Sequence, residues 1–369
     1  MENNKSVLIL VPAITARGGI ANYYHVLKNH FSSIIEYFER GARTWPIRKG
    51  VIQELIRAWK DYVKFKKRLA KGDIKLVQTS TSISLNTTIR DGLFLRHARK
   101  KGLKTIVFFR GWDKMQEKKI ESYFLNIFKY FFFKCDLIIV LSANVKEKIE
   151  KWGYTGQIKL ETTLVDKELI QDYTLFDIDD KFQKFDDTNQ INLLYLSRVE
   201  KRKGIYELIE AVKNFKDVKQ KISLSICGDG FELKNIERKI SEEKLKNITL
   251  KGFVSGIDKK NEFEKAHLFI FPSYEEGMPN AVLEAMGFGL PIITTPVGGL
   301  KDFFKNNEHG LFIKPNDPND IHIKIKTLIK NKELVVKISR TNYSFARETF
   351  QSDIVAKRIE NIFKEVLKS

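Results

Sequence analysis

Residues 271–292 read FPSYEEGMPNAVLEAMGFGLPI. The apolar run at 268–271 predicts a buried strand, and Pro279 suits the first turn of a helix predicted over 280–288, which Gly289 would end. A helix that begins at the carboxyl end of a parallel strand points unpaired backbone N–H groups into the crevice of the sheet, where they attract anions. The stretch therefore predicts a strand, turn and helix of an α/β domain, with an anion site at the turn.

Two glutamates flank this turn, Glu276 in the loop and Glu284 in the helix. Each carboxylate can accept hydrogen bonds from a pair of vicinal hydroxyls. Two of them beside an anion site suit a ligand with phosphate in the middle and a polyol at each end, as in a nucleotide sugar. The simpler interpretations are a helix N-terminal charge worth about 0.3–1 kcal/mol for Glu276 and a solvated helix position for Glu284.

A cationic cluster lies in residues 195–212, YLSRVEKRKGIYELIEAV. Arg198 and Lys203 follow a predicted strand and precede a predicted helix, so they are placed to bind a diphosphate, Arg198 bidentately and Lys203 as a point charge. Gly18 and Gly19 follow the first predicted strand and would let the backbone approach a phosphate closely. A pair of glycines is common in proteins. The prediction of a phosphate-binding site therefore rests on the order of all these motifs along the chain.

Apolar strand-like runs alternate with helical patterns along the chain, which predicts parallel sheets with helices on both faces. Because 369 residues exceed one ordinary core, we expect two Rossmann-like α/β domains. The acidic, aperiodic text DYTLFDIDDKFQKFDDTNQ is interpreted as a linker. The predicted organisation is 1–172 for the N-terminal domain, 173–190 for the linker, 191–345 for the C-terminal domain and 346–369 for a closing helix that packs back on the body. The predicted strands are 7–11, 75–78, 105–109, 137–141, 191–196, 222–227, 248–250, 268–271 and 291–294.

The net charge of +19 is concentrated at the N-terminal end: residues 1–134 contain 27 Lys and Arg against 10 Asp and Glu. We expect this basic region to face an anion, which would be nucleic acid, a phosphorylated substrate or an anionic membrane surface, unless it is simply a solvated surface. Residues 51–72 predict a basic amphipathic helix that packs on the core or also touches lipid headgroups. With no signal peptide, no span of roughly 20 apolar residues and two separate cysteines, a cytoplasmic protein is expected.

The C-terminal half, about 190–345, resembles the family 4 glycosyltransferases, which are retaining sugar-nucleotide enzymes of the GT-B fold, with two Rossmann-like domains facing each other across a cleft. The N-terminal half matches more loosely, through GGIANYY and CDLIIVLSANVKEKI. The matching C-terminal segments occur in the family's order: SRVEKRKGIYELIEAV, ICGDGFEL, LKGFVSG, FIFPSYEEGMPNAVLEAMGFGLPIITTPVGGLKDFF and HGLFIKPND.

The resemblance implies a retaining hexosyltransferase with a UDP- or GDP-sugar donor, no cofactor and no metal. Glu276 would bind donor-sugar hydroxyls near the reacting carbon, and Glu284 would bind the ribose. Arg198 and Lys203 would hold the leaving diphosphate. The remaining donor-side residues would be Gly277, Met278 and Asn280, which orient the sugar through their backbone, and Gly18 and Gly19, which meet the phosphate.

One position departs from the family. Where its members often have a histidine near the donor sugar, VFFRGWDKM places Arg110, which is permanently charged and cannot act as a base. Arg110 could bind sugar hydroxyls or an anionic acceptor, with Trp112 and Asp113 as further acceptor-side candidates.

The resulting hypothesis is a transferase of capsule, lipopolysaccharide or lipid-linked glycan synthesis, cytoplasmic and peripheral on the inner face of the cell membrane. Its partners would be a nucleotide sugar, a glycan or lipid-linked acceptor and an anionic membrane surface. The alternatives are a cytosolic transferase for a small molecule or soluble glucan, a non-catalytic scaffold, and a nucleic-acid-binding protein, for which the sequence shows no recognised module.

Overall fold

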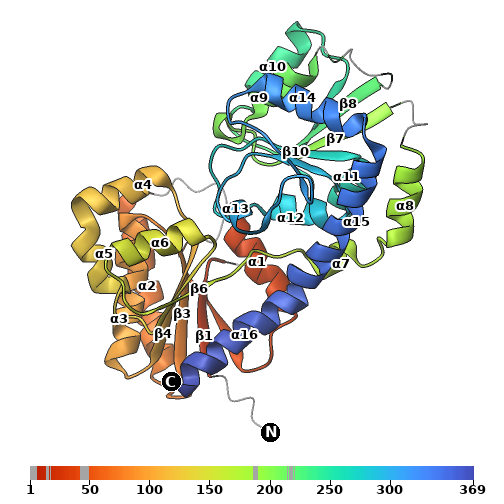
Figure 1. Ribbon diagram of the computed structural model, residues 1–369. Helices are drawn as coiled ribbons and strands as arrows, with labels where there is room; N and C mark the ends of the chain where they lie inside the picture. Colours follow the sequence, from red (N-terminus) through yellow and green to blue (C-terminus); the bar gives the residue numbers. More distant parts are fainter. Residues whose placement is uncertain are drawn as a thin grey trace. The chain divides into compact units, whose positions relative to one another are not determined.

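The computed structural model describes residues 6–13, 16, 18–41, 50–185, 190–213, 215, 219 and 221–369. The chain forms two compact units (Figure 1): unit 1 comprises Met1–Thr162 and Ser352–Ser369, and unit 2 comprises Thr163–Gln351. Each unit is built on one parallel six-stranded sheet with helices packed against it. Within the part of the chain that is described, no helix is both long and apolar enough to cross a bilayer.

The sheet of unit 1 has the strand order β2-β1-β3-β4-β5-β6. Its central strands are buried on both faces because runs such as VLILV and LIIV contain only apolar residues. The strands are β1 (Val7–Val11), β2 (Ile35–Glu39), β3 (Leu76–Ser82), β4 (Lys104–Gly111), β5 (Leu137–Val140) and β6 (Gln157–Leu160). The helices are α1 (Gly19–Leu27), α2 (Val51–Leu69), α3 (Leu85–Lys100), α4 (Lys114–Lys119), the π-turn η1 (Ile120–Phe124), α5 (Leu125–Phe132), α6 (Ala143–Lys151) and α16 (Ser352–Lys368).

Helices cover both faces of this sheet. Phe65 of α2, Phe94 of α3 and Phe128 of α5 pack with Val107 and Phe109 of β4 in one apolar core. The intervening β4 residues face the other side, where the ring of Phe108 meets that of Tyr23 on α1 at 6.1 Å between centroids. The alternation along β4 therefore directs every second side chain toward α1.

The last helix, α16, belongs to unit 1 and lies along it in Figure 1. Its side chains Val355, Ile359 and Phe363 are buried, and Arg358 Nη2 lies 3.0 Å from a carboxylate oxygen of Glu161. The chain thus ends by packing back on its N-terminal unit, and the closing helix begins at Ser352 rather than at residue 346.

The sheet of unit 2 has the order β12-β11-β10-β7-β8-β9, also parallel throughout. Its strands are β7 (Gln190–Leu196), β8 (Lys221–Cys227), β9 (Ile248–Gly252), β10 (Leu268–Phe271), β11 (Ile292–Thr294) and β12 (Gly310–Phe312). Its helices are α7 (Lys167–Ile170), α8 (Leu175–Gln183), the 3-10 turn η2 (Lys201–Lys203), α9 (Ile205–Lys213), α10 (Leu233–Glu242), α11 (Gly256–Lys265), α12 (Asn280–Gly287), α13 (Leu300–Phe303), α14 (Pro318–Ile329) and α15 (Lys332–Thr349).

The predicted α/β fold with two Rossmann-like units is confirmed. The division of the chain differs from the prediction, since the first segment of unit 1 ends at Thr162 rather than at residue 172, and unit 2 begins at Thr163 rather than at residue 191. The polar segment predicted as a linker contains α8, which begins at a capping box between Thr174 and Asp177. Asp177 therefore has a structural role at this helix start, and Asp179 lies 2.9 Å from Arg340 Nε.

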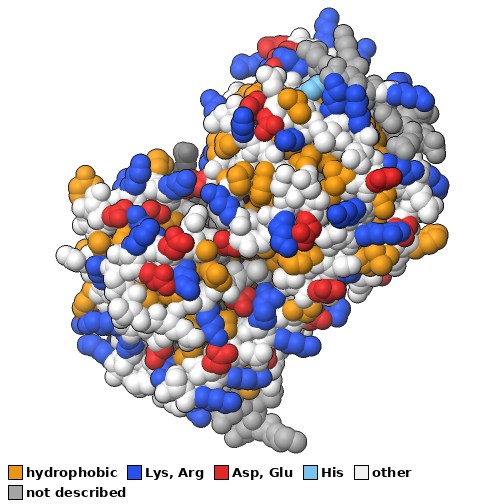
Figure 2. All heavy atoms as spheres, viewed as in Figure 1, with side chains coloured by type: hydrophobic (Ala, Val, Ile, Leu, Met, Phe, Trp, Pro, Cys, Tyr) orange, Lys and Arg blue, Asp and Glu red, His pale blue; other side chains and the backbone are white. Residues whose placement is uncertain are grey.

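The surface charges alternate in sign on the face that Figure 2 shows. Lys and Arg side chains are spread over both units and interspersed with Asp and Glu. On this face the positive charge is not gathered into one patch, so the excess of basic residues in the sequence does not by itself define a binding surface.

Candidate functional site

The candidate site of unit 2 lies where β7 and β10 are neighbours in the sheet. From β7 the chain continues to β8 on one side, and β10 pairs with β7 on the other. Such a change of direction opens a crevice at the carboxyl ends of the two strands, which is the usual ligand position in doubly wound sheets. The loops that leave these strands, 197–204 and 272–279, lie together at this edge of the sheet.

Lys203 and Glu276 meet at this point from the two loops. The Nζ atom of Lys203 contacts Oε1 of Glu276, and the two side chains are only 7% and 14% exposed. Ser273 Oγ donates to the same carboxylate oxygen at 2.9 Å. The other oxygen of Glu276 has no partner among the described residues, so it can accept a hydrogen bond from a ligand hydroxyl.

Two glycines allow neighbouring loops to approach this pair closely. Gly204 has a φ of 70° and lies against the backbone of Pro272, and Gly298 has a φ of 51° and lies against the carbonyl oxygen of Gly277. A Cβ atom at either glycine would overlap those backbone atoms. The Gly299 N–H also donates to the Gly277 carbonyl at 2.7 Å. The loop that carries Glu276 is therefore held by backbone contacts on both sides.

The second glutamate, Glu284, lies in α12 and is only 5% exposed, so its interpretation as a solvated helix residue is wrong. Lys259 of α11 donates to Glu284 Oε1 at 2.9 Å. No side chain caps the first turn of α12, whose N-cap is Pro279. Its backbone N–H groups are therefore available to an anion.

Lys259 is a residue that the sequence did not single out. It is one of two adjacent lysines in the solvated-looking segment GIDKKNEFEK, and nothing in its spacing marks it. Lys259 could have been found only indirectly. Once Glu284 is known to be buried, it needs a cation as a partner, and Lys259 is a candidate.

The remaining predicted donor-side residues of unit 2 lie around this pair. Arg198 is in the β7 loop with Lys203, but its guanidinium is largely exposed and lies 2.9 Å from Glu200. Met278 is buried, and its Sδ atom accepts from the Thr163 N–H at 3.3 Å. Asn280 is the first residue of α12. The structure thus brings Lys203 and Glu276 into contact, whereas Arg198 points toward another carboxylate.

The predicted residues of unit 1 lie at the carboxyl edge of the other sheet. Gly18 is the N-cap of α1, with a φ of 139° and no side-chain cap, and Gly19 is the first residue of the helix. Trp112 Nε1 donates to a Glu117 oxygen at 2.5 Å, and the Asp113 carboxylate caps α4. Trp112 and Asp113 therefore have structural contacts that explain them without a ligand.

Arg110 differs from these residues because the fold buries it without a full set of partners. It is 9% exposed, and its Cζ atom lies 3.6 Å from the centre of the Tyr23 ring. Burial lowers the pKa of its guanidinium, against the opposing influence of Tyr23. A buried cation stacked on a ring at the end of a strand is a candidate ligand contact.

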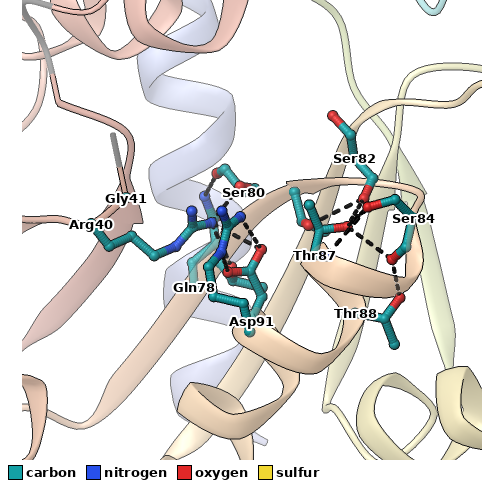
Figure 3. Close-up of polar contacts among 12 residues, drawn as sticks. Arg40, Gly41, Gln78, Ser80, Ser82, Ser84, Thr87, Thr88 and Asp91 are labelled. Atoms are coloured by element: carbon teal, nitrogen blue, oxygen red, sulfur yellow. Dashed lines mark hydrogen bonds and ion pairs between the residues drawn. The ribbon is translucent and has the colours of Figure 1, made fainter. Parts of the chain in front are cut away.

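A polar network occupies the end of β3 in the same unit (Figure 3). Arg40 Nη2 donates to Asp91 at 3.0 Å and to the Ser80 carbonyl at 2.8 Å. Burial alone would raise the pKa of Asp91, but the guanidinium groups of Arg40 and Arg90 hold this pKa below its usual range. Nearby, Ser84 Oγ accepts the Thr87 N–H at 3.2 Å and caps α3. These groups bond to one another, so we interpret the network as support for the strand ends.

Comparison with known proteins agrees with this architecture. A model of the family described as glycosyl transferases group 1 matches residues 177–345. An uncharacterized glycosyltransferase of Methanocaldococcus jannaschii is 28% identical over 324 residues, which is 81% of this chain and 77% of that protein. The capsular polysaccharide biosynthesis glycosyltransferase CapM of Staphylococcus aureus is 26% identical over 242 residues, 63% of this chain and 62% of CapM. The structure of Anabaena HepE in complex with UDP has a TM-score of 0.72 at 16% identity, covering 98% of this chain and 100% of HepE, and shows the fold.

Proposed function

We propose that this chain, which belongs to the glycosyl transferases group 1 family through residues 177–345, transfers a sugar from a nucleotide-sugar donor to a glycan or lipid-linked acceptor. The observation that carries the proposal is the Lys203–Glu276 pair at the switch point of the unit 2 sheet, beside the uncapped start of α12. A cation, a carboxylate and a helix N-terminus in one crevice supply the groups that a sugar diphosphate needs.

The transfer would break the bond between the anomeric carbon of the sugar and the diphosphate oxygen, and form a bond from that carbon to an acceptor oxygen. Lys203, with Arg198 and the first turn of α12, would stabilise the negative charge that develops on the leaving diphosphate. Glu276 would position the sugar by accepting hydrogen bonds from its hydroxyls, and Glu284 would accept those of the ribose. We propose a retaining outcome without a metal, in which the departing phosphate oxygen takes the proton of the acceptor hydroxyl.

The kinds of donor and acceptor follow from what related proteins are described as doing. HepE was crystallised with UDP, which supports UDP as the nucleotide of the donor. CapM is named for capsular polysaccharide biosynthesis, which supports a surface glycan as the acceptor. A soluble glucan or small-molecule acceptor is the second candidate.

The first experiment is thermal denaturation with a panel of UDP- and GDP-sugars, because a ligand that binds only the folded state raises the melting temperature by mass action. The proposal expects stabilisation by at least one member of the panel, and transfer of its sugar to a lipid-linked or oligosaccharide acceptor. If neither nucleotides nor nucleotide sugars raise the melting temperature at millimolar concentration, the proposed donor site in unit 2 is contradicted.

We further propose that α2 brings unit 1 to an anionic membrane surface. The C-terminal half of this helix packs inward, with Phe65 fully buried, but apolar side chains of its N-terminal half are solvent-exposed. At about 3.6 residues per turn, these side chains share one face that is flanked by lysines. The exposed apolar residues are Ile52 at 73%, Leu55 at 65%, Ile56 at 48% and Trp59 at 65%, and the flanking cations are Lys60, Lys66 and Lys67.

The charge of the face supports a membrane as its occupant. An apolar stripe bordered by lysines is complementary to a bilayer that contains anionic lipid, since apolar side chains enter the headgroup boundary while the cations meet phosphates. A cytosolic protein partner would require acidic groups in the same arrangement around an apolar centre, and is the outcome that membrane-independent behaviour would favour.

A further inference from the structure

Arg110 is a buried cation that forms no direct ion pair with any described residue of unit 1. It is the second-last residue of β4, at the carboxyl edge of the sheet. Its Nε and Nη1 atoms are buried and have no hydrogen-bond partner among the residues described. A buried guanidinium with unused N–H groups is costly, because desolvation is not repaid by hydrogen bonds.

Two other arginines of this unit, Arg40 and Arg358, show that the fold can supply carboxylate partners. Arg40, which is 3% exposed, is bonded to the carboxylate of Asp91 at 3.0 Å. Arg358 is bonded to Glu161 at 3.0 Å and 3.2 Å. Glu161 is therefore already engaged by Arg358, and Arg110 is left with aromatic rings, those of Tyr23 at 3.6 Å and Phe108 at 4.9 Å.

The surroundings of Arg110 favour an anion. The Tyr23 hydroxyl is also buried without a partner among the described residues, and burial raises its pKa, so it stays protonated and can donate. Tyr23 lies in α1, whose first turn contains no acidic residue and no side-chain cap. A guanidinium, a phenol O–H and a helix start that carries positive partial charge together provide donors, and the neighbouring carboxylate, that of Glu161, is already bonded to Arg358.

We propose that Arg110 binds an anionic group, a carboxylate or a phosphate, carried by one of the two sugar substrates. This inference rests on the proposed sugar transfer and sharpens it: one substrate is acidic, either through a uronic acid or through a sugar phosphate. The centre of the Tyr23 ring lies 3.6 Å from the guanidinium carbon, so the bonds that Arg110 can still form are those of its N–H groups, whose planar fork suits a carboxylate or phosphate.

The test compares anionic and neutral ligands with the wild-type protein and the Arg110→Met and Arg110→Lys variants. The donor arm uses UDP-glucuronate against UDP-glucose, with UDP alone as the reference. The acceptor arm uses glucuronate and glucose 6-phosphate against glucose, at constant ionic strength and in the presence of UDP. Affinities are measured by calorimetry for the nucleotides and by saturation-transfer NMR for the sugars.

We expect Arg110→Met to weaken at least one anionic ligand by tenfold or more relative to its neutral counterpart, to leave UDP within twofold, and to be partly rescued by Arg110→Lys. A loss in the donor arm identifies an acidic donor, and a loss in the acceptor arm an acidic acceptor. If every ratio of anionic to neutral affinity stays within twofold of wild type, the proposal is overturned. If the wild-type protein binds no nucleotide, the proposed function fails, while the sugar arm still decides the role of Arg110.

A stability measurement separates a ligand contact from a structural role. Because Arg110 lacks partners, the melting temperature of unliganded Arg110→Met is expected to equal or exceed that of wild type. The matched control is Arg40→Met, which leaves the buried Asp91 with Arg90 as its remaining cation and should melt several degrees lower. A similar loss for Arg110→Met would show that this arginine stabilises the fold and would overturn the proposal.

Discussion

The ammonium of Lys203 and the carboxylate of Glu276, which are 73 positions apart, form a mostly buried ion pair between the loops that follow β7 and β10. A donor diphosphate that uses Lys203 must compete with Glu276, and a donor sugar that uses Glu276 must share it with Lys203 and Ser273. If the chain binds a nucleotide sugar as proposed, the pair would couple recognition of the phosphate to recognition of the sugar.

Glu276→Gln is expected to lower the rate of sugar transfer by about 10²–10³-fold, the usual loss when one positioned polar group is removed from a transition state. UDP should bind as tightly as before, or more tightly, because Lys203 loses its internal competitor. Steady-state rates and calorimetric titration with UDP measure the two effects separately.

The control for this variant is Glu275→Gln, which removes the same charge from the neighbouring position of the same loop. It should change transfer by less than threefold. Unchanged turnover in Glu276→Gln, or equal losses in both variants, would refute the positioning role. Because Glu276 is paired with Lys203, Glu276→Gln is also expected to lose about 1–3 kcal/mol in the free energy of unfolding.

The Lys259–Glu284 pair gives a second prediction for the nucleotide. If Glu284 accepts the ribose hydroxyls, Glu284→Gln should raise the Kd of UDP about tenfold, since a hydrogen bond to a charged group contributes about 1.5–3 kcal/mol. Lys259→Met should lower the free energy of unfolding by about 3 kcal/mol, because Glu284 would be left buried without a cation.

The adjacent Lys260 provides the comparison, since it bonds at 3.2 Å to Asp172, whose side chain is 71% exposed. Lys260→Met is expected to change stability by less than about 1 kcal/mol and UDP affinity by less than twofold. If Lys259→Met and Lys260→Met lower the free energy of unfolding equally in urea denaturation, the buried pair of Lys259 with Glu284 contributes no more stability than the exposed pair of Lys260 with Asp172.

The interior strands could be predicted from the sequence because their burial on both faces forces continuous apolar runs. The strands that the sequence did not reveal, β2, β6 and β12, all lie at sheet edges. β2 reads IEYFE and β6 reads QIKL, both only partly buried, and β12 has three residues. Edge strands are often short or keep charged residues on their open side, so hydrophobic patterning did not separate these three from loops, although it located most of β9, the fourth edge strand.

The candidate site was predictable to the extent that motifs follow strand ends. Glu276 and Lys203 could be assigned to two strand ends, but their contact depends on β10 pairing with β7, which is a property of sheet order and not of local sequence. For the same reason, the isolation of Arg110 could not be predicted, because it depends on Glu161 being engaged by Arg358 from the last helix.

The exposed face of α2 predicts binding to anionic membranes. The protein should float with liposomes that contain phosphatidylglycerol, and the double substitution Leu55→Ser with Trp59→Ser should weaken binding at least tenfold, because each apolar side chain contributes about 1.5–3 kcal/mol when fully buried. Ile323→Ser on α14 removes a side chain of similar exposure, 55%, and serves as the control. Binding that is indifferent to lipid charge and to salt would contradict the membrane proposal.

Lys181 of α8 predicts the pH dependence of stability. Burial lowers its pKa from 10.5 to about 7, although its Nζ atom donates to the Ala266 carbonyl at 3.1 Å and lies 5.1 Å from the centre of the Tyr173 ring. Between about pH 7 and pH 10.5 the unfolded state binds this proton and the folded state does not, so the free energy of unfolding should rise with pH across that window.

Lys181→Met should remove this slope and increase the free energy of unfolding at pH 6 by up to about 5 kcal/mol, since the pKa falls from 10.5 to about 7 and one pH unit corresponds to about 1.4 kcal/mol. Urea denaturation at several values between pH 6 and pH 10 measures the effect. Lys184→Met is the matched control, because Lys184 is 70% exposed and lies 2.6 Å from Asp180 in the same helical segment. A wild-type stability that stays level from pH 7 to pH 10, or a slope that survives in Lys181→Met, would show that Lys181 keeps its proton in the folded protein.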